Sequence, residues 1–225
     1  MPAGVVIAGG RSTRFGDEDK AVAALAGVPM IRRVADRLAP VVDVLVVNCR
    51  ADQREPIADA LAGYDRPVRF AVDPDPDRGP MAGIRTGLRE VESTDSAYAF
   101  VAACDMPFLD ADLVEYLFER ARGREPGESD ASGEEGSPAE VAKARDAAVP
   151  RPTEWFETTH AVYRATPMAD ACDRALARGE HKIIEPLFEL DYVTVGADEL
   201  AAFDADSFEN VNTREEFAAA EERLR

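Results

Sequence analysis

The stretch that decides the fold is Ala3-Gly-Val-Val-Ile-Ala-Gly-Gly-Arg-Ser-Thr-Arg-Phe-Gly-Asp-Glu-Asp-Lys20. Its apolar run from Val5 to Ala8 predicts a buried strand, and Gly9-Gly10 ends that strand. Glycines after a strand let backbone N–H groups approach a ligand closely, and cations beyond them suit a polyphosphate. The loop lacks the Gly-Lys-Ser/Thr ending of a P-loop and the G-x-G-x-x-G of a dinucleotide site. We therefore expect a phosphate-binding loop of another kind.

Apolar segments after this loop alternate between the periods of strands and helices. Further strands are predicted at 41–47, 68–72, 98–103, 146–149, 158–164 and 192–195. Helices are predicted to begin near Pro29, Asp52, Pro80, Asp110, Pro167, Ile183 and Thr213. This alternation predicts an α/β domain with a mostly parallel central sheet and helices on both faces.

Polar residues at three of these helix starts carry capping signals. Asp52 with Glu55 and Thr213 with Glu216 have the spacing of a capping box, and Asp110 suits an N-cap. The segment 123–142 breaks the pattern, because it is rich in Gly, Pro, Ser and acidic residues. Strand patterns resume after it, so we expect a flexible acidic insertion within a single domain spanning 1–225.

The charge balance is strongly acidic. Asp and Glu number 44 against 26 Lys and Arg, for a formal net charge of −18, and three of the basic residues are lysines. Such a surface disfavours nucleic acid as a partner. It resembles the surfaces of proteins from salt-accumulating organisms, and this predicts a halophilic protein. Because so few basic residues are lysines, Lys20 in the first loop looks chosen as a compact point charge.

Other features of the composition bear on the compartment. No apolar run approaches the roughly 20 residues that span a membrane, and neither a signal peptide nor a membrane partner is indicated. The three cysteines are far apart in sequence and form no C-x-x-C pair. We expect a cytoplasmic protein in a reducing compartment.

Polar residues that follow the predicted strands are candidates for a site. Asn48 follows the second strand, Asp73 the third and Asp105 the fourth, and ligands of open α/β sheets bind at that carboxyl edge. A carboxylate such as Asp105, opposite a phosphate loop, is suited to Mg²⁺. Lys20 and Arg14 are the cations that would face the phosphates.

The sequence resembles the molybdenum cofactor guanylyltransferase family, which has a three-layer, Rossmann-like nucleotidyltransferase fold. The family signature Leu-Ala-Gly-Gly, Arg, Gly, Asp-Lys is matched by Ile7-Ala8-Gly9-Gly10, Arg14, Gly16 and Asp19-Lys20. Three later motifs also match. They are Gly79-Pro80-Met81-Ala82-Gly83, Cys104-Asp105-Met106-Pro107, and Asn210-Val211-Asn212-Thr213.

The resemblance implies roles for the matching residues. Arg14, Lys20 and Asp105 would be catalytic, with Asp105 holding Mg²⁺. The nucleotide would be bound by Ile7, Ala8, Gly9, Gly10, Lys20, Asn48, Asp73, Gly79, Gly83 and Asp105. The acceptor would be bound by Asn210, Asn212 and His160.

The activity implied is transfer of GMP from GTP to molybdopterin with release of pyrophosphate. Molybdenum cofactor biosynthesis proteins would be its partners. Alternatives remain open: a cytidylyltransferase of the same fold, a guanylyltransferase with another phosphate acceptor, or a catalytically silent nucleotide-binding subunit. GTP is favoured because relatives that use CTP tend to carry Ala-Ala-Gly where this chain has Ala8-Gly9-Gly10.

Overall fold

A computed structural model describes residues 1–10, 19–75, 78–124 and 143–225. Its centre is a seven-stranded sheet in the order β5-β4-β1-β6-β8-β7-β9. Only β8 runs against its neighbours, and the other pairings within the sheet are parallel. The strands are β1 (Pro2–Ile7), β4 (Val44–Cys49), β5 (Val68–Val72), β6 (Tyr98–Ala103), β7 (Ala147–Arg151), β8 (His160–Arg164) and β9 (Tyr192–Gly196).

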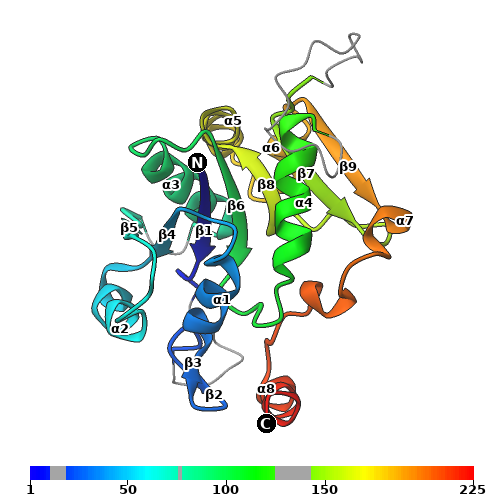
Figure 1. Ribbon diagram of the computed structural model, residues 1–225. Coiled ribbons are helices and arrows are strands. Elements are labelled where there is room, and N and C mark those ends of the chain that lie inside the picture. The colour runs from blue at the N-terminus through cyan, green and yellow to red at the C-terminus, as the bar shows by residue number, and fades with distance from the viewer. Residues whose placement is uncertain (11–18, 76–77, 125–142) are drawn as a thin grey trace.

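Helices cover both faces of the sheet, so the fold has three layers (Figure 1). Helices α1 (Met30–Leu38) and α4 (Ala111–Arg122) pack on one face, and α3 (Pro80–Val91) and α5 (Ala165–Ala177) on the other. Neighbouring side chains of a strand point to opposite faces. In β1, Val6 accordingly packs with α1 and α4, whereas Val5 packs with α3 and α5. The mostly parallel α/β fold predicted from the sequence is confirmed.

The strand order places a crevice at the carboxyl edge of the sheet. The first four sheet strands in the chain, β1, β4, β5 and β6, lie in the order 3-2-1-4, so the order reverses on either side of β1. Loops after β1 and β6 diverge at such a point and leave room for a ligand. This edge faces the lower part of Figure 1, where the hairpin β2 (Ala24–Leu25) and β3 (Val28–Pro29) and helix α8 (Arg214–Arg223) lie.

Shorter elements complete the fold. They are η1 (Ala51–Gln53), α2 (Arg54–Ala60), α6 (Ile184–Leu187), α7 (Ala197–Leu200) and η2 (Ala205–Phe208). Gly123, with φ near 72°, ends α4 in the left-handed conformation that glycine adopts at no steric cost. The predicted insertion begins at this point, and 125–142 lie outside the described residues. Strands from both sides of it belong to the same sheet.

Several local expectations are confirmed. Helix α1 begins directly after Pro29, and Pro80 occupies the first position of α3. Oδ1 of Asp110 accepts a hydrogen bond from the N–H of Asp112 at the start of α4. Thr213 and Glu216 form the predicted capping box of α8. Strands β5 and β6 have the predicted bounds.

Other expectations are wrong in detail. Strand β4 begins at Val44, because Val41 and Val42 belong to the turn whose N–H groups donate to the carbonyl of Leu38. Helix α5 begins at Ala165, before Pro167, since proline is tolerated throughout the first helical turn.

The capping box predicted from Asp52 and Glu55 is absent. Helix α2 has no side-chain cap, and Asp52 pairs with Arg50 instead. The N–H of Arg50 donates to Oε1 of Gln53, at the start of η1.

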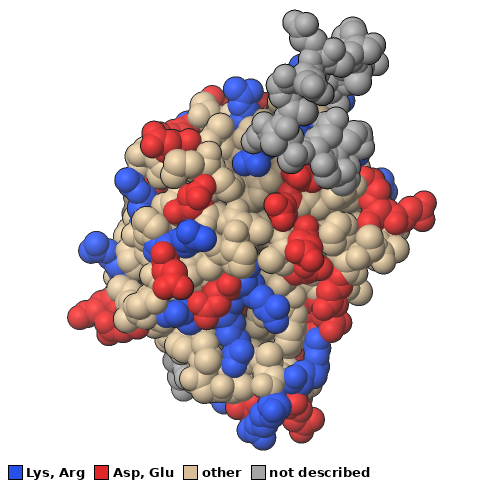
Figure 2. Space-filling view, viewed as in Figure 1, with Lys and Arg blue, Asp and Glu red and all other residues tan. Residues whose placement is uncertain are grey.

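The excess of acidic residues is spread over the surface and does not form one patch on the visible face (Figure 2). Asp and Glu side chains are spread over the visible face with Lys and Arg between them (Figure 2). Within the described ranges, each helix is too short or too polar to cross a membrane.

Candidate active site

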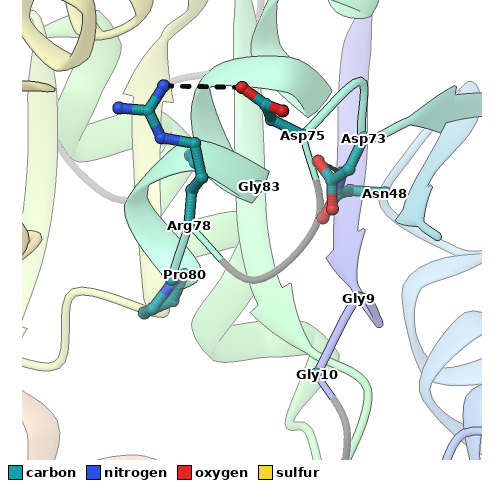
Figure 3. A pocket seen from close by; sticks show the side chains of 10 residues that line it. Gly9, Gly10, Asn48, Asp73, Asp75, Arg78, Pro80 and Gly83 are labelled. Atoms are coloured by element: carbon teal, nitrogen blue, oxygen red, sulfur yellow. Dashed lines mark hydrogen bonds and ion pairs between the residues drawn. The ribbon is translucent and has the colours of Figure 1, made fainter.

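A pocket of about 300 Å³ opens at the carboxyl edge, between the loop after β1 and the start of α3. Figure 3 shows Asn48 and Asp73 side by side on its wall, with Gly9 and Gly10 leaving the end of β1 below them. Its lining is Gly9, Gly10, Asn48, Asp73, Asp75, Arg78, Gly79, Pro80, Ala82 and Gly83. Six of these residues are among the predicted nucleotide-binding set, so the structure brings together positions from β1, β4, β5 and α3.

Asn48 is fixed at the back of this pocket. It lies within β4, one residue before its end, and not after the strand as predicted. Its side chain is fully buried, and its Nδ2 donates to the carbonyl of Ala71 at 3.1 Å and to Oδ1 of Asp73 at 2.7 Å. Its Oδ1 is buried and has no hydrogen-bond partner within the described residues. A buried acceptor without a donor is costly, so a hydrogen bond from an N–H or O–H of a ligand would stabilise it.

Glycines allow the close approach of three segments around Asn48. A Cβ at Gly83 would lie 2.4 Å from Oδ1 of Asn48, and one at Gly9 would lie 2.8 Å from Oδ2 of Asp73. Gly79 has φ near 83°, which L-residues with a side chain rarely adopt. The pocket therefore depends on missing side chains at these positions. The first backbone N–H groups of α3 have no partner inside the helix, so its start suits an anion.

A second group of side chains lies around Lys20. Its Nζ is 2.5 Å from Oδ2 of Asp105 and 3.0 Å from Oδ1 of Asn212, and only 5% of the residue is exposed. The three side chains come from the end of the first loop, the end of β6 and the segment before α8. Sequence reasoning gave them separate roles on phosphate, metal and acceptor. The structure brings them into direct contact.

One carboxylate oxygen of Asp105 has no hydrogen-bond partner among the described residues. Oδ1 is buried without a hydrogen-bond partner among the described residues, while Oδ2 accepts from Lys20. The rest of the described chain offers no cluster of three or more His, Cys, Asp or Glu side chains for a metal. A single carboxylate is enough protein ligand for Mg²⁺. This ion usually takes its remaining ligands from water and from substrate phosphates.

The segment that carries the two predicted acceptor asparagines is anchored to Asp105. The N–H of Val211 donates to the carbonyl of Asp105 at 2.9 Å, which places Asn212 beside Lys20. This segment forms neither a strand nor a helix. Nδ2 of Asn210 makes a long contact of 3.5 Å with the carbonyl of Phe208.

His160 has a different environment from the other predicted site residues. It is fully buried in β8, packed against the rings of Phe100 and Phe208, with Nε2 3.3 Å from Oγ of Ser207. Burial lowers the pKa of His160 to about 3, so the ring is neutral. The ring supports η2 and the following segment. Its Nδ1 is buried without a hydrogen-bond partner among the described residues, and His160 does not line the pocket. An acceptor contact by His160 therefore stays a prediction without geometric support.

Three residues at or beside the site were not predicted from the sequence. Arg78 lines the pocket, and its Nη1 is 3.8 Å from Oδ2 of Asp75. Arg50 donates from Nη1 to the carbonyls of Gly9 and Gly10, at 3.0 and 2.9 Å.

Gln53 is almost fully buried beside the same loop and bonds to its backbone. No local signal in the sequence marks Arg50 and Gln53, because their partners in the first loop are distant in the chain.

The remaining predicted residues lie at the end of β1 or outside the described ranges. Ile7 is the last residue of β1, and the N–H of Ala8 donates to the carbonyl of Asn48 at 2.8 Å. Arg14, predicted to hold the triphosphate, lies outside the described residues.

Relatives with known names match the chain over nearly its full length. A protein of the halophile Natronomonas pharaonis, named probable molybdenum cofactor guanylyltransferase, is 51% identical over 98% of this chain and 97% of its own. One from Methanosarcina mazei with the same name is 35% identical over 94% of this chain and 86% of its own. The crystal structure of molybdopterin-guanine dinucleotide biosynthesis protein A from Archaeoglobus fulgidus superposes with a TM-score of 0.73 at 26% identity. It covers 100% of this chain and 98% of that one.

The family model for the MobA-like NTP transferase domain matches residues 4–193, a range that runs from β1 through the pocket and Asp105 into β9. The glycine-rich strand end, the pocket at the start of α3 and the carboxylate after β6 thus lie inside the matched domain, and the chain belongs to the MobA-like NTP transferase family.

Proposed function

We propose that the protein transfers GMP from GTP to the terminal phosphate of molybdopterin, releasing pyrophosphate and forming the guanine dinucleotide cofactor. The observation that carries this proposal is the contact of Lys20 with Asp105 and Asn212 next to a pocket lined by Asn48 and Asp73. A cation, a carboxylate with a free oxygen and a pocket with unpaired polar atoms are the parts that phosphoryl transfer requires. The names of the relatives give the same activity.

The nucleotide would occupy the pocket at the carboxyl edge. Oδ1 of Asn48 and the carboxylate of Asp73 are acceptors on one wall, and guanine presents adjacent N–H donors. The start of α3 and the glycine backbone after β1 supply N–H groups for phosphates and ribose. Lys20 lies at the far end of the same loop, at a position suited to the β- and γ-phosphates.

The reaction needs no covalent intermediate. An oxygen of the acceptor phosphate would attack the α-phosphorus of GTP, and the bond from that phosphorus to the bridging oxygen would break as pyrophosphate leaves. Lys20, and by resemblance Arg14, would neutralise the charge that develops on the leaving pyrophosphate. Asn212 would orient Lys20 through its hydrogen bond and reach toward the acceptor side.

Mg²⁺ is the metal that we propose for this site. Oδ1 of Asp105 would hold it, because that oxygen is buried and lacks a protein partner. When bound, the ion would neutralise phosphate charge and polarise the phosphorus–oxygen bonds. Lys20 keeps its contact with the other carboxylate oxygen in the structure described here.

The cytoplasm is the proposed compartment, and other proteins of molybdenum cofactor synthesis are the proposed partners. The three cysteines are free, which fits a reducing environment.

The test is release of pyrophosphate with each of the four nucleoside triphosphates, with and without molybdopterin, in molar potassium chloride. We expect release with GTP, Mg²⁺ and molybdopterin together. Release with CTP in place of GTP would instead support a cytidylyltransferase. GTP binding without release would indicate a silent nucleotide-binding subunit. Release that needs a different phosphate acceptor would keep the reaction type and replace molybdopterin.

A further inference from the structure

The side-chain amide of Gln53 connects the two ends of the first loop. Its Nε2 donates to the carbonyl of Ala8 at 2.9 Å, just after β1, and to Oδ2 of Asp19 at 2.7 Å, just before Lys20. Its Oε1 accepts from the N–H of Arg50 at 3.0 Å. We call this set of three hydrogen bonds the Gln53 bridge.

All hydrogen-bonding groups of this amide have assigned partners. Both Nε2 protons face oxygen atoms and Oε1 faces an N–H, so the network itself fixes the orientation of the amide. Gln53 is only 1% exposed, and buried polar networks that are fully satisfied are rigid. The distance between the backbone at Ala8 and the side chain of Asp19 is therefore held by one buried group.

Asp19 passes this restraint to Lys20. Its other carboxylate oxygen, Oδ1, accepts from the N–H of Ala21 at 3.0 Å, and its carbonyl accepts from the N–H groups of Val22 and Ala23. Lys20 thus sits between two residues whose backbone and side chains are fixed. Arg50 adds hydrogen bonds to the carbonyls of Gly9 and Gly10 at the other end of the loop.

We propose that Gln53 is a positioning residue for nucleotide binding, which holds Ala8 and Asp19 at a fixed separation and thereby places Lys20. This inference rests on the proposed nucleotidyltransferase function. It assigns Gln53 no contact with substrate. Its effect passes through Asp19 to Lys20, and through Ala8 to the glycine backbone that lines the pocket.

Two variants break the bridge in different ways. Gln53→Met keeps the length and volume of the side chain and removes both donors. Gln53→Glu keeps the shape but sets a carboxylate against Oδ2 of Asp19 and the carbonyl of Ala8. Glu55→Gln is the matched control, because Glu55 is exposed and lies two residues away on α2.

The measurements are GTP affinity by calorimetry, the KM for molybdopterin, and the melting temperature with the circular dichroism of each variant. We expect GTP affinity to fall at least about 10-fold in both Gln53 variants, as for loss of a hydrogen bond to a charged group. The KM for molybdopterin and the affinity of Glu55→Gln should match wild type. A residue that only stabilises the fold would lower the melting temperature and leave the GTP affinity of the folded protein unchanged.

A double variant tests the contact itself. In Gln53→Glu with Asp19→Asn, the donor and acceptor exchange sides, so part of the lost GTP affinity should return. If neither single Gln53 variant folds, Asp19→Asn alone sets two amide donors against each other and should weaken GTP binding in the same way.

Unchanged GTP affinity in folded Gln53→Met and Gln53→Glu would overturn the role of Gln53 while the proposed function stands. Wild-type protein that binds no nucleoside triphosphate would contradict the proposed function itself.

Discussion

Nζ of Lys20 lies 2.5 Å from Oδ2 of Asp105, and this contact joins residues 85 positions apart in the chain. The end of the first loop and the end of β6 thus meet at one ion pair. Only 7% of the lysine side chain and 16% of the aspartate side chain are exposed. Removing either partner leaves the other poorly solvated, so the two residues have to be tested together.

We expect Asp105→Asn to lower turnover by at least about 10²-fold, as is usual when a charge that stabilises the transition state is lost. Lys20→Met should do likewise, and the double variant should lose less than the sum of both, because the residues are in contact. Pyrophosphate release measures turnover, and Asp112→Asn, an exposed residue of α4, is the control. Normal turnover and Mg²⁺-dependent GTP binding in Asp105→Asn would remove the metal assignment.

Asn212 should affect GTP as well as the acceptor. A purely acceptor-binding Asn212 would leave GTP affinity intact in Asn212→Ala. Its Oδ1, however, accepts a hydrogen bond from Lys20 at 3.0 Å, so we expect GTP affinity to fall by about 3- to 10-fold. Asn210→Ala is the comparison, since Asn210 contacts the carbonyl of Phe208 instead. Equal GTP affinities in both variants would show that the contact with Lys20 has no role in binding.

Gly83→Ala should close the pocket around Asn48. The added Cβ would lie 2.4 Å from Oδ1 of Asn48, so helix α3 or the asparagine has to move. Gly87→Ala, one turn later, would place a Cβ 2.5 Å from Cγ1 of Val5 in the core. Both variants should melt earlier than wild type, and GTP affinity per folded molecule should fall mainly in Gly83→Ala. Gly196→Ala, which meets no atom, should change neither quantity.

The buried His160 predicts a loss of stability in acid. Its pKa is about 3 in the folded protein and near 6.5 in an unfolded chain, so between these values the unfolded state binds the extra proton. The free energy of unfolding should therefore fall as pH drops below about 6.5, by up to about 1.4 kcal/mol per pH unit from this residue. Denaturant unfolding of wild type and His160→Gln from pH 7 to pH 4 measures how the free energy of unfolding depends on pH. If the free energy of unfolding changes with pH in the same way in both proteins, His160 is not buried as a neutral ring.

Salt should stabilise this chain. Its formal net charge is −18, and the Debye length shrinks from about 30 Å at 0.01 M to about 3 Å at 1 M salt. Repulsion among the excess acidic residues then no longer reaches across the fold. The melting temperature should rise steeply between low and molar potassium chloride. A flat or falling curve would show that the acidic composition serves another purpose.

How far the sequence predicts the fold depends on whether a signal is local. Strands β5 and β6 have sharp ends because polar residues and turns flank them, and Thr213 and Glu216 mark the start of α8 within four residues. The predicted start of β4 was wrong because Val41 and Val42, apolar residues of a turn, have the same sequence pattern as a buried strand.

The site shows the same division. Positions at strand ends, such as Asn48 and Asp105, follow from the rule that parallel strands bring their carboxyl ends to one edge. Gln53 and Arg50 could not be found in this way, because their partners Ala8, Asp19 and Gly9 lie more than thirty residues away. The buried state of His160 is equally a tertiary property, as it depends on Phe208 and Ser207 from the other end of the chain.

The contact between Lys20 and Asn212 has a consequence for how such a protein can diversify. The pocket residues and Asp105 all precede α4, whereas Asn212 follows β9, the last strand of the sheet. A lineage could exchange its later half for one that recognises a different acceptor and keep its nucleotide chemistry intact. The new half would have to satisfy one inherited requirement, an oxygen atom presented to the ammonium group of Lys20.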